Sequence, residues 1–221
     1  PEAMEVLEAA AESMGCRITR TEDCTRKEHS PEGQTFLYKG REYFIHLLGR
    51  HQLRNAAVAI EIASALQKTG AEVTEENIRN GLAETRWPGR LEIIRKGSKT
   101  WILDGAHNAA AAGCLTETLR ECWPDTKFTA VTGVFRDKEY SKIAEILSGV
   151  LDRAICIDLP DGSRSLPKED LAAVYENVGV KSDVSDSIET AIKEATSDAV
   201  LVTGSLSLLR SAKEGIEKFY F

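Results

Sequence analysis

Residues 101–108 read WILDGAHN and join two different patterns of side chains. The apolar run at 101–103 is typical of a buried strand, and an alanine-rich helical pattern begins directly after Asn108. Asp104 is therefore expected at the carboxyl end of the strand, followed by a tight turn of small residues, with Asn108 as a favoured helix cap. The free N–H groups at such a helix start can bind an anion. The residues are also compatible with a plain junction in which Asp104 accepts hydrogen bonds from loop amides.

Around this stretch, from Arg90 onward, strand-like and helical patterns alternate along the chain. Strands are expected at 91–96, 100–104, 128–134, 154–158 and 199–203, with a weaker one near 180–184, and helices at 109–122, 138–150, 168–177, 186–196 and 206–217. Such alternation implies an α/β fold, a Rossmann-like, mostly parallel sheet with helices on both faces. Ligands of these folds bind at the carboxyl ends of the strands.

Upstream, Trp87-Pro88-Gly89 interrupts the chain, and we place a domain boundary there, between residues 1–88 and residues 89–221. The first part is expected to contain helices at 2–14, 53–68 and 74–83 and a β-hairpin of 35–39 and 41–48. Residues 16–34 are polar and are expected to be irregular.

The composition excludes several classes of protein. The 221 residues carry a formal net charge of -7 with a pI near 5.3, which argues against a nucleic-acid binder. No apolar run approaches the length of about 18 residues that indicates a membrane-spanning helix, and the first residues do not resemble a signal peptide. The five cysteines are odd in number and form no CxxC pair, so neither a disulfide framework nor a zinc site is expected. A reducing cytoplasm fits this pattern.

Several short motifs together carry a resemblance to a known family. They are WPGRLE at 87–92, DGAHN at 104–108, GRHQLRNAA at 49–57, DKE at 137–139, SRSL at 163–166 and VTGSL at 202–206. In this order they strongly resemble the folylpolyglutamate synthase and dihydrofolate synthase family, the folate branch of the Mur ligase superfamily. Other Mur ligases favour a tyrosine in place of Gly105, which is why the folate branch is the better match.

The resemblance implies roles for individual residues. It implies that Asn55 contacts the adenine of ATP, with His51 and Gln52 shaping that pocket, and that Arg90 reaches ATP phosphate. It further implies that Asp104 meets the ribose or the metal-bound phosphates, that His107 positions the glutamate or the reacting groups, and that Ser205, Lys138 and Arg164 hold substrate carboxylates. Judged without the family, each of these residues also has an ordinary structural explanation, as a helix-start residue, a cap or a solvated surface charge.

The implied activity is the ATP-dependent addition of L-glutamate to a folate through an acyl phosphate. No G-x-x-x-x-G-K-[ST] phosphate loop occurs, so residues 1–88 resemble only the later part of a P-loop-type ATPase domain, and ATP and Mg²⁺ are expected to need a missing N-terminal part. We expect this chain to be inactive alone and prone to self-association, whereas the full-length enzyme is expected to be monomeric. Two alternatives stay open, a dihydrofolate synthase or bifunctional enzyme, and a stand-alone module that binds a nucleotide or an amino acid.

Overall fold

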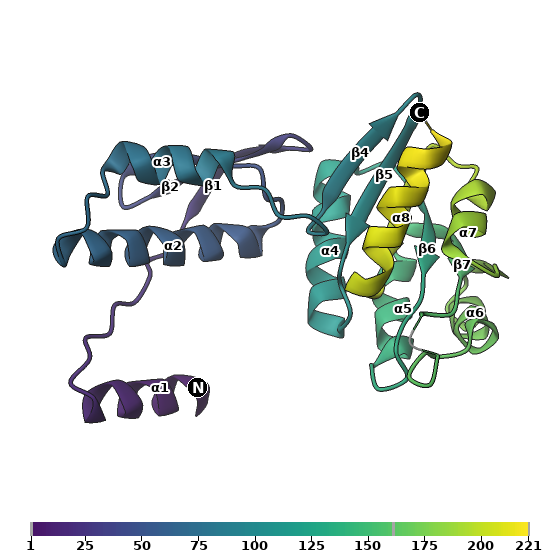
Figure 1. The fold of residues 1–221 in the computed structure, drawn as a ribbon, viewed down its shortest axis with the longest axis horizontal. Coiled ribbons are helices and arrows are strands. Elements are labelled where there is room, and N and C mark those ends of the chain that lie inside the picture. Colours follow the sequence, from purple (N-terminus) through teal and green to yellow (C-terminus); the bar gives the residue numbers. More distant parts are fainter. Residues whose placement is uncertain (1, 161, 221) are drawn as a thin grey trace.

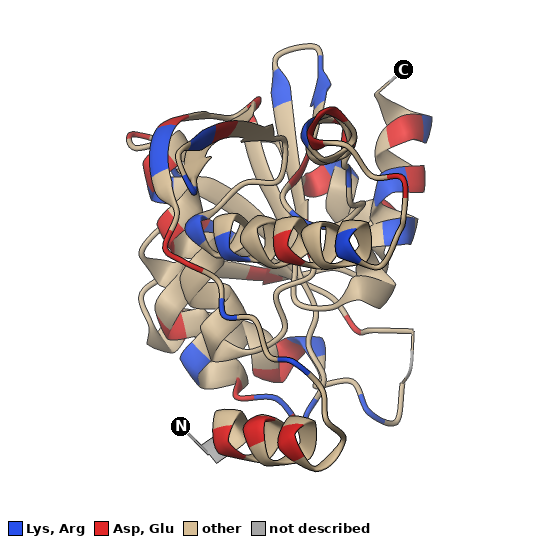
Figure 2. Cartoon of the chain, turned by 90° about the vertical axis from the view of Figure 1, so that its left-hand side faces the viewer, with Lys and Arg blue, Asp and Glu red and all other residues tan. Residues whose placement is uncertain are grey.

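The computed structural model describes residues 2–160 and 162–220, which form two β-sheets with their own helices (Figure 1). Residues 25–84 make up the first lobe and residues 92–219 the second lobe. Helix α1 (Glu2–Ser13) lies away from both sheets at the end of an extended segment, and its charged residues are all glutamates (Figure 2). Trp87, Pro88 and Gly89 lie in the segment that connects the lobes.

The first lobe is a three-stranded antiparallel sheet packed against two helices. Its elements are β1 (Thr25–Ser30), β2 (Gly33–Tyr38), β3 (Arg41–Ile45), α2 (Arg50–Lys68) and α3 (Glu75–Glu84). The sheet contributes Phe36 and Tyr43 to a shared core, and α2 contributes Ala57. Helix α3 starts at a reciprocal cap, in which Thr74 Oγ1 accepts from the N–H of Asn77 and Asn77 Oδ1 accepts from the N–H of Thr74.

Two expectations for the first lobe are corrected by the structure. Residues 16–34 are not irregular throughout, because Thr25–Ser30 forms β1 at the edge of the sheet. This strand has no apolar alternation since most of its side chains are exposed, and main-chain pairing with β2 holds it in place. Helix α2 begins at Arg50 rather than residue 53, which puts His51 and Gln52 in its first turn.

The second lobe confirms the expected α/β fold. Its elements are β4 (Glu92–Lys96), β5 (Lys99–Asp104), α4 (Ala109–Cys122), β6 (Phe128–Thr132), α5 (Tyr140–Ser148), β7 (Leu151–Cys156), α6 (Lys168–Asn177), β8 (Lys181–Val184), α7 (Ile188–Glu194), β9 (Ala199–Thr203) and α8 (Leu206–Phe219). The six strands lie in the order β4-β5-β9-β6-β7-β8. Strand β4 is antiparallel to β5, and the other neighbours are parallel.

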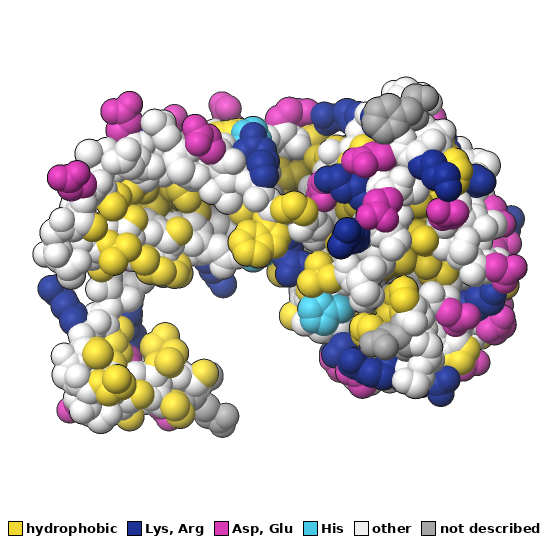
Figure 3. Space-filling view, in the orientation of Figure 1, with side chains coloured by type: hydrophobic (Ala, Val, Ile, Leu, Met, Phe, Trp, Pro, Cys, Tyr) yellow, Lys and Arg dark blue, Asp and Glu magenta, His cyan; other side chains and the backbone are white. Residues whose placement is uncertain are grey.

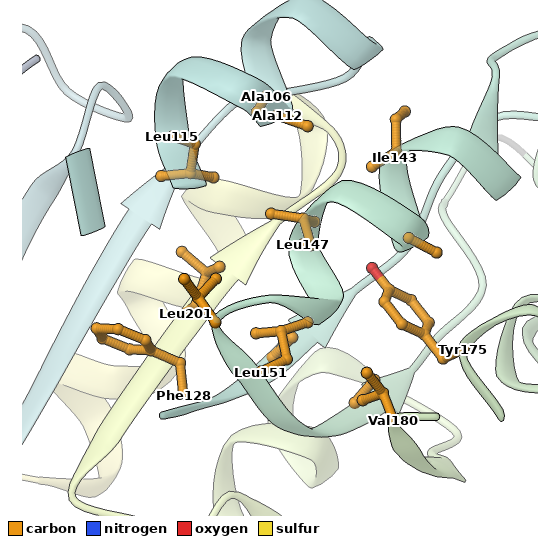
Figure 4. Packing of buried hydrophobic residues seen from close by; sticks show 14 of the residues in the cluster. Ala106, Ala112, Leu115, Phe128, Ile143, Leu147, Leu151, Tyr175, Val180 and Leu201 are labelled. Carbon is orange, nitrogen blue, oxygen red and sulfur yellow. The ribbon is translucent and has the colours of Figure 1, made fainter. Parts of the chain in front are cut away.

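Each face of this sheet has its own core because successive strand side chains point to opposite sides. Leu201 of β9 packs with Leu115 of α4, Leu147 of α5 and Tyr175 of α6 on one face (Figure 4). Trp101 and the neighbouring apolar residues pack under α7 and α8 on the other face. The helices therefore cover both faces, as the alternating sequence predicts.

One strand of the second lobe begins earlier than predicted. Strand β7 starts at Leu151, before the expected residue 154, because the polar residues Asp152 and Arg153 lie inside it. The guanidinium of Arg153 donates to the carboxylate of Asp183 on the neighbouring edge strand, at 2.7 Å. A charged side chain inside this strand thus finds a partner on the edge strand, whereas the sequence predicted the strand only from residue 154.

The strand order places three chain segments together at one end of the sheet. After β5 the chain passes through α4 to β6, and β9 later fills the position between those two strands. The residues that follow β5, β9 and β6 therefore lie side by side at the carboxyl end of the sheet. This is the position at which open α/β sheets bind ligands.

Candidate functional site

The tip of β5 is held by the carboxylate of Asp104, which is only 9% exposed. Its Oδ1 accepts a hydrogen bond from the N–H of Ala106 and its Oδ2 one from the N–H of Leu91, both at 2.9 Å. Burial raises the pKa of this carboxyl above its usual value, while the two amides and the Arg90 guanidinium oppose that rise. Asp104 thus joins its own turn to the segment that enters β4.

The entering segment passes very close to this tip. Leu91 has a left-handed backbone with φ 45°, which residues other than glycine rarely adopt. The N–H of Gly105 donates to the carbonyl of Gly89 at 3.0 Å. A Cβ atom at Gly105 would lie 2.3 Å from Cδ2 of Leu206 and 2.8 Å from Nη1 of Arg90, so glycine leaves room for both side chains at the strand tip.

A first cleft of about 430 Å³ opens between the two lobes beside this tip. The candidate residues that line it are His51, Gln52 and Asn55 of α2, Arg90 of the connecting segment, and Asp104 and His107 after β5. The structure therefore brings together every residue that the sequence analysis assigned to the nucleotide. The cleft also borders the start of α4, where Asn108 Oδ1 accepts from the N–H of Ala111 at 2.8 Å.

The positive charge in the first cleft comes from Arg90. Burial lowers the pKa of the His51 imidazole below its usual value, and the charge of Arg90 lowers it further against the opposing effect of Glu117. His51 is therefore neutral at physiological pH. An anion that entered the cleft would meet the guanidinium of Arg90, whose forked donors match phosphate oxygens.

Two amide side chains of α2 are joined in the same cleft. Nδ2 of Asn55 donates to Oε1 of Gln52 at 2.9 Å, and Gln52 is 8% exposed whereas Asn55 is exposed. The remaining polar groups of the Asn55 amide are free to contact a ligand.

A second cleft of about 330 Å³ lies on the other side of His107. It is lined by Lys138 and Arg164, by Ser205 and its neighbours at the start of α8, and by Phe135. Both cations contact the carboxylate of Asp137, Lys138 at 2.9 Å and Arg164 at 3.6 Å. They hold the pKa of Asp137 below its usual value, the Lys138 hydrogen bond most strongly. Two cations around one carboxylate leave positive charge available for an anionic ligand.

Ser205 lies deep at the wall of the second cleft and is 4% exposed. Its Oγ accepts from the N–H of Ser207 at 3.3 Å as the cap of α8, and it lies 2.8 Å from the Ser207 hydroxyl. Gly204 before it has φ 112°, and a Cβ there would come within 2.4 Å of the carbonyl of Gly133. The turn thus depends on glycine to bring the start of α8 against the end of β6.

His107 borders both clefts. Its Nδ1 lies 2.9 Å from the carbonyl oxygen of Gly105, which accepts only if Nδ1 carries the proton. The other ring nitrogen, Nε2, is then the atom available to a ligand. His107 is therefore the candidate residue that connects the two clefts.

The sequence analysis missed a cluster of ion pairs that spans the two lobes. The guanidinium of Arg26 on β1 donates twice to the carboxylate of Glu121 on α4, both at 2.6 Å, and Arg50 approaches the same carboxylate at 3.1 Å. These hydrogen bonds, that from Arg26 above all, hold the pKa of Glu121 below its usual value. Residues so far apart in the chain carry no shared local pattern, so no motif could have indicated this contact.

Arg136 joins two loops beside the second cleft. Its Nε donates to the carbonyl of Ser165 at 2.7 Å, and its N–H donates to the carbonyl of Arg164 at 2.9 Å. The guanidinium of Arg164 in turn lies 4.7 Å from the ring centre of Phe135. Arg136 thereby supports the loop that presents Arg164.

The described residues do not provide a metal site of their own. Among residues 2–160 and 162–220 there is no group of three or more His, Cys, Asp or Glu side chains placed to hold an ion. Asp104 is a single carboxylate whose oxygens each already accept an amide hydrogen bond, and Mg²⁺ would need its other oxygen ligands from elsewhere. Over the same residues, no helix is both long and apolar enough to cross a membrane.

Known proteins resemble this chain in sequence and in fold. The family model for the Mur ligase, glutamate ligase domain matches residues 89–206, just over half of the chain. A dihydrofolate synthase/folylpolyglutamate synthase of Bacillus subtilis is 29% identical over 98% of this chain and 53% of its own length. The crystal structure of the folylpolyglutamate synthase of Thermotoga maritima superposes with a TM-score of 0.80 at 30% identity, over 96% of this chain and 51% of that one. A folylpolyglutamate synthase of Mycobacterium tuberculosis, complexed with ADP and AMPPCP, gives 0.79 at 28% identity, over 98% and 53%. The chain spans about half the length of the relatives it matches.

Proposed function

The chain belongs to the Mur ligase family, and we propose that it supplies the glutamate-binding side of an ATP-dependent ligase that adds L-glutamate to a folate. The observation that carries this proposal is the pair of clefts joined by His107. One cleft offers Arg90 and the start of α4 to a phosphate, and the other offers two cations and the start of α8 to carboxylates. A ligase that couples a nucleotide to an amino acid needs these two sites side by side.

In this proposal the domain boundary lies at Trp87–Gly89. Residues 89–221 form the glutamate ligase domain, and residues 1–88 form the C-terminal portion of an ATPase domain. The separate cores of the two lobes support this division. In full-length relatives the remaining length would supply the phosphate loop and the ligands of Mg²⁺, since the residues described here do not form such a set.

The residues of the first cleft are proposed to bind ATP. Asn55 contacts the adenine, with Gln52 and His51 forming the wall behind it, and Arg90 contacts a phosphate. Asp104 acts by holding the strand tip and the backbone at Leu91, which keeps Arg90 in the cleft. ATP activates the folate carboxylate as an acyl phosphate with release of ADP.

The residues of the second cleft are proposed to bind the amino acid. Lys138 and Arg164 neutralise the carboxylates of L-glutamate, and Ser205 with the first amides of α8 donates hydrogen bonds to one of them. The amino group then attacks the acyl carbon, the new C–N bond forms and phosphate leaves. His107 Nε2 orients the attacking amine and takes up the proton that it loses.

Binding measurements on the two clefts test this assignment. Calorimetric titration is expected to show ADP and L-glutamate binding to the chain independently. Arg90→Ala should weaken ADP about tenfold, since a charge-assisted hydrogen bond contributes about 1.5–3 kcal/mol, and leave glutamate unchanged. Lys138→Ala should weaken the binding of glutamate and leave that of ADP unchanged. Arg210→Ala serves as a control because that side chain is 88% exposed. The assignment would be contradicted if either variant lost the binding of both ligands, or if neither variant lost the binding of any ligand.

Turnover is proposed to require the rest of a full-length ligase. The chain alone should release no ADP in response to folate and glutamate, because it has no phosphate loop. Joined to the preceding half of the Bacillus subtilis relative, it should become active, and His107→Asn in that hybrid should lose most of the turnover. Activity of the chain alone would refute this part of the proposal.

A second candidate substrate is favoured by the name of that relative, which includes dihydrofolate synthase. Dihydropteroate and tetrahydrofolate, supplied separately to the active hybrid, distinguish the first addition of glutamate from later ones. We place the reaction in the cytoplasm, in keeping with the free cysteines.

A further inference from the structure

The two walls of the first cleft belong to different lobes. Helix α2 of the first lobe provides His51, Gln52 and Asn55, whereas the second lobe provides the tip of β5 and the first turns of α4. The second cleft, by contrast, is lined only by residues of the second lobe. The separation of the lobes therefore sets the width of the first cleft and leaves the second cleft unchanged.

One side of α4 extends from the first cleft to a contact between the lobes. Ala111 and Cys114 line the cleft, and Thr118 and Glu121 follow at spacings of four and three residues, so these side chains lie on the same side of the helix. A Cβ atom on Gly49 would lie 2.8 Å from Oγ1 of Thr118, so glycine allows the start of α2 to approach α4 closely. Glu121 lies about one turn beyond this contact.

The carboxylate of Glu121 joins α4 to two elements of the first lobe. It accepts two hydrogen bonds from Arg26 of β1, both at 2.6 Å, and Arg50 of α2 approaches it at 3.1 Å. The Arg26 side chain is only 9% exposed, so water and salt screen this pair little. Another pair between the lobes, Arg95 with Glu32 at 3.0 Å, has both side chains more than half exposed and contributes less. We refer to Arg26, Arg50 and Glu121 as the ion cluster.

The start of α2 is in turn fixed to the sheet of the first lobe. Gln34 of β2 is 2% exposed, and its Nε2 donates to the carbonyls of Leu47 and Gly49, at 2.7 and 2.9 Å. The carbonyl of Gly49 also accepts from the N–H of Gln52 at 3.0 Å. The residues of α2 that line the first cleft are thus attached to the same sheet that carries Arg26 of the ion cluster.

We propose that the ion cluster holds the lobes at the separation at which the first cleft binds a nucleotide. The inference rests on the proposed nucleotide site and adds to it positioning residues outside the cleft. Arg26 and Glu121 do not line the cleft, so they act on nucleotide affinity through the placement of α2 against α4. When the pair is broken, some molecules lose the observed arrangement, and the apparent dissociation constant increases by the inverse of the fraction that keeps it.

Calorimetric titration of Glu121→Gln tests the proposal. ADP should bind about tenfold more weakly than to the native chain, which corresponds to about one molecule in ten keeping the observed arrangement. L-Glutamate should bind with unchanged affinity, because the second cleft lies within one lobe. Asp183→Asn is the matched control, since it breaks the 2.7 Å pair with Arg153 inside the second lobe and should change neither affinity.

Two further variants separate positioning from a loss of folding. Arg50→Ala removes the member of the ion cluster that is 59% exposed, and it should weaken ADP about threefold in a folded chain. Arg26→Met combined with Glu121→Gln should bind ADP no more weakly than Glu121→Gln alone, because both substitutions break the same pair. Losses that multiply in the double variant would show that the two residues act separately, and would overturn the proposal.

The outcomes distinguish this inference from the proposed function. Equal ADP affinity of the native chain and Glu121→Gln overturns the inference and leaves the proposed nucleotide site intact. Equal weakening of ADP and L-glutamate in Glu121→Gln has the same meaning, since the substitution would then act on the fold as a whole. No ADP binding by the native chain overturns both the inference and the proposed nucleotide site.

Discussion

Asp104 fixes the backbone of the first cleft, which it also lines. Both of its oxygens accept backbone amides, and one of those amides belongs to the left-handed residue Leu91. The motif DGAHN indicated an important acid, and family resemblance gave it a role at the nucleotide. The two-residue spacing to Ala106 could suggest one of its contacts, but the contact to Leu91 depends on how β4 and β5 pair and is visible only in the structure.

Replacing Asp104 by asparagine should therefore affect the fold directly. The amide NH₂ of asparagine would face a backbone N–H, leaving a buried donor unpaired at a cost of about 1–3 kcal/mol. Urea unfolding should show this loss for Asp104→Asn. Asp137→Asn, at a half-exposed carboxylate, should change stability much less, because water screens its ion pairs. Equal effects of the two substitutions would contradict the structural role of Asp104.

His51 should make stability depend on pH. Its folded-state pKa lies below the ordinary value of 6.5, so as the pH falls below 6.5 the unfolded chain takes up the proton first. Stability should accordingly decrease as the pH falls through this window, and recover as it rises. Urea midpoints of the native chain and His51→Asn, compared between about pH 5 and about pH 8, should show a smaller decrease in the variant. Parallel curves would refute the buried neutral state.

At the scale of elements, the predictions succeeded where local signals were strong. Helix α4 occupies the expected residues because Asn108 caps it. Strand β9 also does so because it coincides with a continuous apolar run. Strand β1 was missed because its six residues are polar, and an edge strand held by main-chain bonds needs no apolar alternation. The motifs indicated residues that line the two clefts, whereas the connection of the clefts through His107 depends on the strand order.

The ion cluster between β1, α2 and α4 should hold the lobes in their observed relation. Glu121→Gln would leave the Arg26 guanidinium, 9% exposed, without its counter-charge, which should lower stability by about 2 kcal/mol. Hydrogen exchange should also increase at the N–H of Arg90, which donates to the carbonyl of Trp87 in the connecting segment. Glu214→Gln breaks an exposed pair on α8 and should change stability by less than about 0.5 kcal/mol. An unchanged exchange rate in Glu121→Gln would exclude a role in lobe placement.

At the scale of the whole molecule, apolar side chains are exposed on α1 and along one side of α2 (Figure 3). On α2 they are Val58, Ile62 and Leu66, each about half exposed or more. Contiguous apolar surface of this kind favours association. Sedimentation velocity should therefore show concentration-dependent self-association of the chain. Ile62→Glu should reduce it and Val184→Glu, at an isolated exposed valine of β8, should not; a monomer at every concentration would contradict this prediction.

Hydrogen bonds attach the connecting segment to β5, and they determine which parts of the molecule can move together. Gly89 and Leu91 are both bonded to the strand tip, through Gly105 and Asp104. Any rotation of one lobe relative to the other must then occur about the backbone of Thr85 to Pro88, which precedes Gly89. Arg90 would then move with the second lobe, and it would approach Gln52 and Asn55 of α2 only when the lobes are close together.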